Sequence, residues 1–188
     1  MGRGRGEELK GAPLILWTIS GSSIHKVWPY MDIVVKQVLA VFPEARIVTV
    51  GDERCKLIEN GLPQSDRIIK RSAVWSIRET MAFAKQCNLV VGPETGVMSA
   101  VSMERMPKIL LLSHSSVENL SRDWVNTHSM FSKETPCYSC HKQIYTWDQC
   151  NRFEKTGVAH CMSHIHPQDV WKTVLEALDV KMEAQSNG

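Results

Sequence analysis

Short apolar runs alternate along this chain with segments in which apolar residues recur at helical spacing. The runs cover residues 13–17, 46–50, 67–70, 89–91 and 108–112, and helical patterns follow at 31–42, 54–59, 76–87 and between 95 and 107. The run at 67–70 is weak and typical of an edge strand, and Ser76 is expected to cap the helix that follows it. Strands that alternate with helices indicate a mostly parallel sheet with right-handed crossovers. The pattern therefore predicts an α/β fold, with a Rossmann-like sheet flanked by helices.

The two ends of the chain depart from this alternation. Residues 1–11 are polar and rich in glycine, which predicts a flexible leader. Past residue 112 the pattern becomes irregular and, over 136–166, rich in cysteine and histidine, until an amphipathic helix is predicted over 167–182. We therefore expect one domain over residues 12–182, containing the Cys-rich segment, and a tail at 183–188.

Polar residues follow the predicted strands at the edge where the loops of a parallel sheet converge. A lysine among serines and a helix start with a threonine suit a diphosphate, a carboxylate after the second strand suits ribose hydroxyls, and a carboxylate beside phosphate donors suits a sugar. The candidates are Ser22, Ser23, Lys26, Thr95 and Gly96 for the diphosphate, Glu94 for the sugar, and Glu53 and Trp75 for the ribose or base. This set predicts a sugar-nucleotide site. The alternative is that residues 94–96 only cap a helix.

Composition narrows the classes of protein that remain. The chain has 188 residues, 43% of them hydrophobic, and 22 Lys plus Arg against 20 Asp plus Glu. The resulting net charge of +2 gives no electrostatic footprint for nucleic acid. No apolar run approaches the roughly 18 residues that span a bilayer, and neither a dinucleotide-binding nor a P-loop glycine motif is present. We expect a cytoplasmic protein.

Four late cysteines form a second candidate site. Cys137, Cys140, Cys150 and Cys161 lie within 25 residues, and the first two have the C-x2-C spacing of zinc sites. The remaining spacings match no standard zinc finger. The sequence therefore leaves two interpretations open: a structural zinc ion, or thiols that stay reduced or pair as disulfides. No cofactor is expected for catalysis.

Three motifs resemble glycosyltransferase family 9, the heptosyltransferase family of lipopolysaccharide assembly. They are the SSIHKVWP run at 22–29, the GPETGV turn at 92–97, and the late cysteines followed by His166-Pro167-x-x-Val170. The resemblance covers residues 12–178 and matches the C-terminal, donor-binding domain of a GT-B fold. It implies that Lys26, with Ser22 or Ser23, holds the donor diphosphate. It also implies that residues 94–96 bind the donor sugar and phosphates.

The chain departs from the family at three points. Glu94 stands where the family usually has Asp, Ser99 stands where it has His, and the family's N-terminal acceptor half has no counterpart in the sequence. The resemblance thus implies a donor domain that transfers a heptose or related sugar from an ADP-sugar to a glycan or lipopolysaccharide core acceptor. Catalysis would require an N-terminal acceptor domain, and location could extend to the periphery of the inner membrane. The alternative is a non-catalytic nucleotide-binding or zinc-stabilised interaction module.

Overall fold

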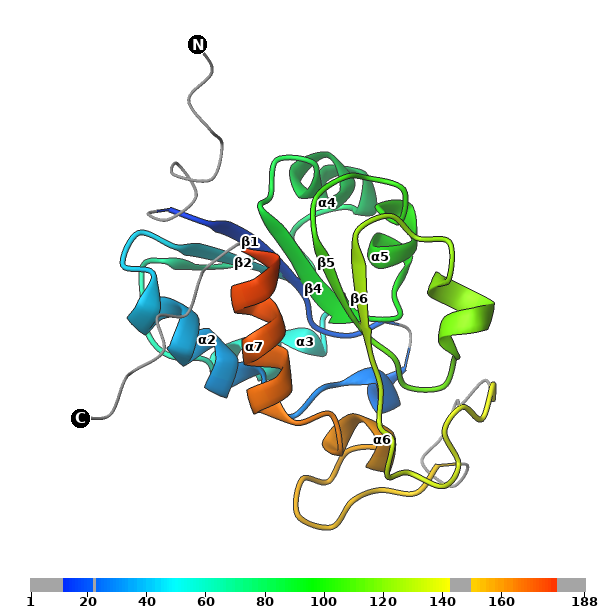
Figure 1. Ribbon diagram of the computed structural model, residues 1–188. Helices are drawn as coiled ribbons and strands as arrows, with labels where there is room; N and C mark the ends of the chain where they lie inside the picture. Colours follow the sequence, from blue (N-terminus) through cyan, green and yellow to red (C-terminus); the bar gives the residue numbers. More distant parts are fainter. Residues whose placement is uncertain (1–11, 22, 143–149, 179–188) are drawn as a thin grey trace, which may run out of the picture.

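Six parallel strands form a single sheet at the centre of the molecule (Figure 1). The computed structural model describes residues 12–21, 23–142 and 150–178. The strands are β1 (Leu14–Thr18), β2 (Arg46–Val50), β3 (Ile68–Lys70), β4 (Leu89–Pro93), β5 (Lys108–Leu111) and β6 (Thr127–Met130). Their order is β3-β2-β1-β4-β5-β6, and each neighbouring pair is parallel. The predicted α/β class is confirmed.

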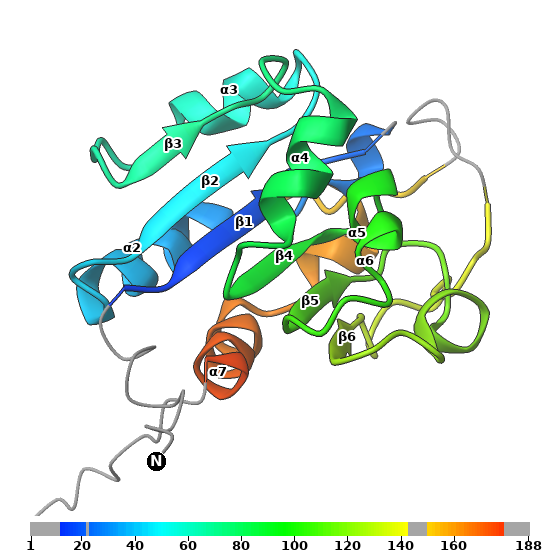
Figure 2. The same cartoon turned by 90° about the horizontal axis from the view of Figure 1, so that it is seen from above.

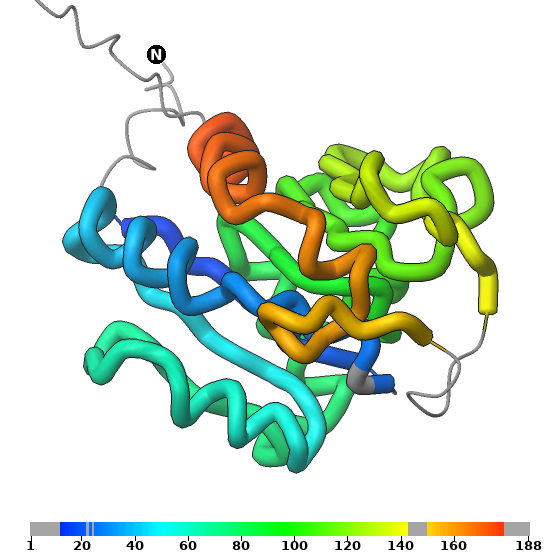
Figure 3. Tube along the Cα trace, turned by 90° about the horizontal axis from the view of Figure 1, so that it is seen from below, coloured from blue at the N-terminus to red at the C-terminus, as the bar shows by residue number. Residues whose placement is uncertain are grey.

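Helices cover both faces of the sheet and make three layers (Figure 2). One face carries α2 (Met31–Val41), α3 (Cys55–Asn60), α6 (His160–Ser163) and α7 (Pro167–Ala177), and the other carries α4 (Ile77–Ala84) and α5 (Gly96–Ala100). Helices α2 and α7 lie beside each other on the first face (Figure 3). A 3-10 turn, Ile24–Lys26, and a π-helical turn, Val117–Ser121, lie in loops.

Successive residues of the strands point into two separate cores. Along β1, Ile15 and Trp17 pack with the α2 and α7 side, whereas Leu16 packs with the α4 and α5 side. Because both faces are covered, the central strands are apolar at nearly every position, as the sequence pattern indicated. All residues of β4 and β5 are buried.

The strand order reverses between β1 and β4. The chain builds β1, β2 and β3 outward in one direction and then crosses back to place β4 on the other side of β1. Gly92 lets these strands approach, since a Cβ atom there would lie 1.9 Å from Thr18 Oγ1 and 2.6 Å from the Thr18 carbonyl oxygen. In open α/β sheets the loops that diverge at such a point leave a crevice for ligands.

The structure corrects the sequence prediction at three elements. A sixth strand, β6, pairs with β5 in the stretch that looked irregular, because its THSM sequence is half-buried at the sheet edge and has no apolar run. Helix α5 ends at Ala100, and α7 ends at Ala177 rather than 182, although residues from 179 on lie outside the described ranges. The predicted leader and tail also lie outside them. The edge position of β3 and the Ser76 cap of α4 are confirmed.

Candidate functional site

A cavity of about 310 Å³ opens at the point where the strand order reverses. The loops after β1, β2 and β4 and the start of α4 enclose it. Its lining is polar at Thr18, Ser20, Asp52 and Thr95, apolar at Val50, Trp75, Ile77 and Val97, and completed by Gly21, Gly51, Thr80 and Gly96. The lining therefore offers polar groups for a charged or hydroxylated ligand and apolar surface for a flat one.

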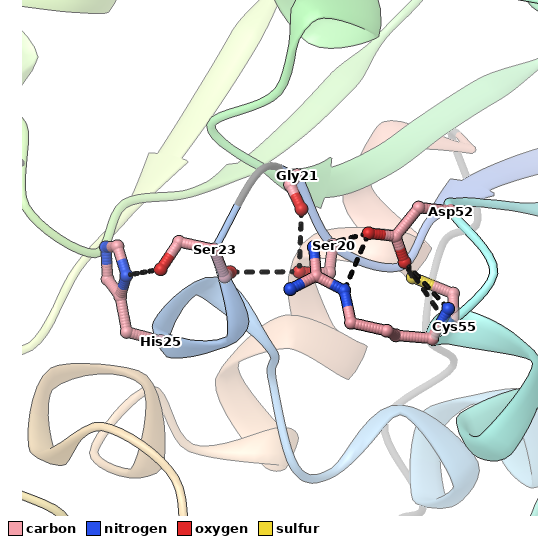
Figure 4. A network of polar contacts seen from close by, with 7 residues as sticks. Ser20, Gly21, Ser23, His25, Asp52 and Cys55 are labelled. Atoms are coloured by element: carbon pink, nitrogen blue, oxygen red, sulfur yellow. Dashed lines mark hydrogen bonds and ion pairs between the residues drawn. The ribbon is translucent and has the colours of Figure 1, made fainter. Parts of the chain in front are cut away.

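The loop after β1 is braced by its own side chains (Figure 4). The Ser20 hydroxyl donates to the Ser23 carbonyl oxygen at 3.1 Å, and the Ser23 hydroxyl contacts His25 Nδ1. His25 is buried, and its Nε2 has no hydrogen-bond partner among the described residues. Burial, followed by the charges of His114 and Lys26, lowers the pKa of His25 to about 4. The imidazole is therefore neutral at pH 7.

Lys26 links this loop to the turn after β4. Its Nζ donates to the Glu94 carbonyl oxygen at 2.9 Å, which places the ammonium one residue before Thr95. Burial lowers the pKa of Lys26, and the Glu94 charge opposes that effect. Lys26 also lies against Gly21, where a Cβ atom would be 3.6 Å from its Cδ. The predicted diphosphate residues Lys26, Thr95 and Gly96 are thus neighbours in space, whereas Ser22 lies outside the described residues.

Thr95 and Gly96 form the start of α5 beside the cavity. The Thr95 hydroxyl accepts from the Met98 N–H at 3.3 Å and lies 3.4 Å from Thr18 Oγ1. No atom would lie within 4 Å of a Cβ atom added at Gly96. Packing within the protein therefore does not require glycine at this position, and the space beside it belongs to the cavity.

The Glu94 carboxylate points toward the loop after β5. Its Oε1 accepts from the N–H groups of Ser113, His114 and Ser115 at 2.5, 2.8 and 3.3 Å, and from the Ser113 hydroxyl at 2.7 Å. Oε2 lies 3.0 Å from His114 Nδ1. Burial by itself raises the pKa of this carboxyl, but the bonds from residues 113–115 and the His114 charge outweigh burial and leave it below its usual range. Glu94 thereby ties the turns after β4 and β5 together, and its contact with a sugar stays a prediction.

After β2, Asp52 rather than Glu53 borders the cavity. The Glu53 side chain is 75% exposed and pairs with Lys56, whereas Asp52 lines the cavity and binds Arg54 through Oδ2. Burial raises the pKa of Asp52, but the Arg54 hydrogen bond and charge and the Cys55 N–H lower it overall. The sequence does not distinguish these two neighbouring carboxylates, because the exact turn after β2 decides which of them faces the cavity.

Trp75 lines the cavity, and its contact with a ribose or base stays a prediction. Its ring lies 4.9 Å from that of Phe83, centroid to centroid, and the Arg71 guanidinium lies 5.7 Å from its centroid. Thr80 and Ile77, which sequence reasoning did not select as site residues, also line the cavity.

The four late cysteines are free thiols. Cys161 is buried, Cys140 and Cys150 are half-buried, and Cys137 is exposed. Within the described residues, no three His, Cys, Asp or Glu side chains are gathered closely enough to hold a metal ion. The same residues contain no helix with the length and apolarity needed to cross a membrane.

The sheet order and the cavity at its switch point define a Rossmann-like α/β domain, and solved structures share this fold. E. coli ADP-heptose lps heptosyltransferase II matches over 88% of this chain with a TM-score of 0.66 and 14% identity. The glycosyl transferase family 9 protein from Veillonella parvula DSM 2008 matches over 90%, with 0.63 and 15%. E. coli heptosyltransferase WaaC with ADP matches over 89%, with 0.58 and 12%.

The chain spans less than half of each of these structures, namely 46%, 47% and 45% of their lengths. The matches therefore confirm the resemblance at the level of the fold, which is that of a part of family 9 glycosyltransferases. No family model and no curated protein matches the sequence.

Proposed function

We propose that this chain is the sugar-nucleotide-binding domain of a family 9 type glycosyltransferase. Its substrate would be an ADP-sugar, carrying heptose or a related sugar, and its acceptor a glycan or lipopolysaccharide core. The cavity at the β1–β4 switch point carries the proposal, because an aromatic ring, a carboxylate and the start of α5 line it, following β3, β2 and β4 respectively. The fold match to a heptosyltransferase solved with ADP supports the choice of nucleotide.

The lining of the cavity suggests how the nucleotide would lie. The base would stack on Trp75, and Asp52 would accept hydrogen bonds from the ribose hydroxyls. The diphosphate would reach Thr95, Gly96 and Lys26. A volume of about 310 Å³ is at the lower end for small-molecule sites, about 300–1,000 Å³. The sugar would therefore extend beyond the cavity, toward the turns after β4 and β5.

The chemical role of these residues is to stabilise the leaving group. When a sugar leaves a nucleoside diphosphate, negative charge develops on the departing phosphate, and a preorganised ammonium favours that charge. Lys26 would fill this role, since the Glu94 carbonyl oxygen holds its ammonium close to Thr95. The acceptor hydroxyl needs a base to take its proton, and we propose that an N-terminal acceptor domain, from a longer chain or a partner, supplies it. With a lipid-linked acceptor, the protein would act in the cytoplasm at the inner membrane.

Calorimetric titration with ADP and with an ADP-sugar tests the proposal. We expect both to bind, and Trp75→Ala to weaken ADP by about 1–3 kcal/mol, the range for a base stacked on an aromatic ring. Val74→Ala is the matched control, because Val74 is 64% exposed and does not line the cavity. Absence of ADP binding, or an equal loss in both variants, would contradict the assigned site.

A further inference from the structure

A second cavity, of about 430 Å³, lies between the edge strand β6 and the start of α7. Its walls come from β6, from the loop that follows β6 and from the junction of α6 with α7. The lining includes three imidazoles, an ammonium, a carboxylate and an aromatic ring, from His128, His164, His166, Lys133, Asp169 and Phe131. The cavity at the switch point shares none of these residues. We call this second cavity the β6–α7 groove.

Neighbouring residues hold two of the imidazoles in place. His164 Nδ1 donates to the His160 carbonyl oxygen at 2.7 Å, and the two rings stack with centroids 4.8 Å apart. Because a carbonyl oxygen only accepts, Nδ1 carries a proton, and Nε2 is the atom of the neutral ring that accepts. His166 Nε2 lies 3.6 Å from Glu134 Oε1. The groove therefore presents oriented polar side chains beside the start of α7.

The groove mixes hydrogen-bond donors with acceptors and does not concentrate one sign of charge. Lys133 only donates, the Asp169 carboxylate only accepts, and neutral imidazoles do both. A sugar hydroxyl also donates and accepts at once, so such a lining suits it better than it suits a phosphate. Phe131 adds an apolar surface for the C–H groups of a sugar ring, and its own ring stacks on Tyr138 with centroids 5.0 Å apart. The chemistry of the groove therefore favours a hydroxyl-rich ligand.

Along the carboxyl edge of the sheet, the groove follows the candidate site (Figure 2). The strand order is β3-β2-β1-β4-β5-β6, and the proposed nucleotide takes the same order, with the base after β3, the ribose after β2 and the diphosphate between β1 and β4. The donor sugar would then extend toward the turns after β4 and β5. Because β6 comes next, the groove beside it is where a second substrate would meet that sugar.

Hydrogen bonds tie the walls of the groove to loops of the candidate site. The buried indole of Trp28, in the loop after β1, donates to the Ile165 carbonyl oxygen at 2.9 Å and so holds the junction of α6 with α7. In the loop after β6, the His141 N–H donates to the His114 carbonyl oxygen at 2.9 Å, and His114 contacts the Glu94 carboxylate. The groove thus has a fixed position relative to the candidate site.

We propose that the β6–α7 groove binds the hydroxyl-rich glycan that accepts the sugar. This inference rests on the proposed function, because it assigns a place to the acceptor of the same reaction. The acceptor hydroxyl oxygen would form the new bond to the anomeric carbon of the donor sugar, and the bond from that carbon to the ADP oxygen would break. The hydroxyl proton would pass to the base of the N-terminal acceptor domain. The groove would hold the glycan from the side of the donor domain.

Binding of the full chain to an array of immobilised neutral and phosphorylated oligosaccharides tests the groove. We expect neutral oligosaccharides to be retained, and Asp169→Ala and Lys133→Ala each to weaken their binding about tenfold or more, as for loss of a hydrogen bond to a charged group. Both side chains are exposed, so the variants should fold. Lys172→Ala is the matched control, because Lys172 lies on α7, is 75% exposed and does not line the groove.

NMR spectra locate the retained oligosaccharide. We expect it to shift the ring signals of His164 and His166, whereas ADP should shift the indole signal of Trp75. Retention of no oligosaccharide or of phosphorylated ones alone, equal binding by the three variants, or a glycan that shifts Trp75 and neither histidine would overturn the proposal. ADP titration reports separately on the proposed function. Failure of ADP to bind would contradict the sugar-nucleotide site and the role of acceptor, whereas ADP binding without glycan binding would overturn the groove alone.

Discussion

Glu94 shows how the surroundings of a residue assign its role. From the sequence alone, Glu94 was compatible either with binding a sugar hydroxyl or with capping a helix. In the structure Thr95 caps α5, while Glu94 accepts hydrogen bonds from the loop after β5. The Glu94 carboxylate oxygens point into the protein, so a sugar would have to reach them there to make a contact.

Glu94→Gln separates these roles. We expect it to lower the free energy of unfolding by about 1–3 kcal/mol, because bonds to a charged acceptor become bonds to a neutral one. Thermal denaturation measures this loss, and titration measures the ratio of ADP-sugar to ADP affinity. If the ratio falls as well, the carboxylate also serves the sugar. Unaltered stability would contradict the structural role.

Lys26→Ala should weaken ADP binding by about 1.5–3 kcal/mol, the range for hydrogen bonds to charged groups. The physical reason is loss of the ammonium that the Glu94 carbonyl oxygen holds beside Thr95. Lys36→Ala is the control, since Lys36 lies on α2, is 61% exposed and pairs with Asp32. If Lys26→Ala and the unsubstituted protein bind ADP with equal affinity in calorimetry, Lys26 does not bind the phosphates.

At the scale of elements, two glycines on either side of the turn after β4 serve different purposes. Gly92 is where β1 and β4 touch, whereas Gly96 opens onto the cavity. The same substitution should therefore act on folding at one position and on binding at the other.

Gly92→Ala should destabilise the chain by about 3 kcal/mol or more, because a methyl group 1.9 Å from Thr18 Oγ1 forces the strands apart. Gly96→Ala should keep or raise stability, by up to about 1 kcal/mol, since alanine suits a helix better than glycine. Its methyl group should nevertheless reduce ADP affinity. Urea denaturation and calorimetry of both variants check the contrast, and an unfolded Gly96→Ala or a stable Gly92→Ala would refute it.

A second carboxylate joins elements on the other side of β1. Glu59, at the end of α3, is buried, and its Oε1 accepts from the Thr49 hydroxyl at 2.6 Å, the Ser72 hydroxyl at 2.7 Å and the Ser72 N–H at 3.2 Å. These bonds connect α3, β2 and the loop after β3.

Glu59→Ala should leave these buried donors unsatisfied and cost at least about 1–3 kcal/mol of stability. Glu53→Ala, on the exposed side of the preceding turn, should change stability by less than about 0.5 kcal/mol. Chemical denaturation distinguishes them, and similar losses in both variants would count against the connection.

At the scale of the whole molecule, buried titratable groups set the response to acid. Burial holds the folded pKa of His25 near 4, below the ordinary 6.5, so the unfolded chain binds the proton more readily. Its contribution to stability is present above about pH 6.5 and is lost as pH falls toward 4. Glu94, with a lowered pKa, acts in the same direction below its ordinary value of about 4.3.

We therefore expect the free energy of unfolding to fall between pH 6.5 and 4, and His25→Gln to flatten that part of the profile. Urea denaturation at pH 7.5, 6, 5 and 4 provides the measurement. Parallel profiles for the two proteins would show that His25 does not carry the effect.

The sequence indicated the fold well where the signal was local. Apolar runs of β1, β2, β4 and β5 are long enough to be recognised because both faces of the sheet are covered. The Ser76 cap was also predictable, since serine is a favoured residue before the first turn of a helix. The structure adds that Glu79 makes the cap reciprocal. Strand β6 gave no such signal, because only its pairing with β5 makes Thr127–Met130 extended.

The amino-acid sequence by itself determined the alternation of strands and helices as far as β5, the parallel sheet, and the edge at which candidate site residues gather. These properties follow from the period of apolar residues and from local capping, which act over a few residues. Tertiary structure alone decided that Asp52 and not Glu53 faces the cavity, and that Glu94 turns to residues 113–115. Each of these outcomes depends on the exact direction in which a loop leaves its strand, because a shift of one residue reverses which side chain points inward. Each also depends on contacts between that loop and residues from distant parts of the chain.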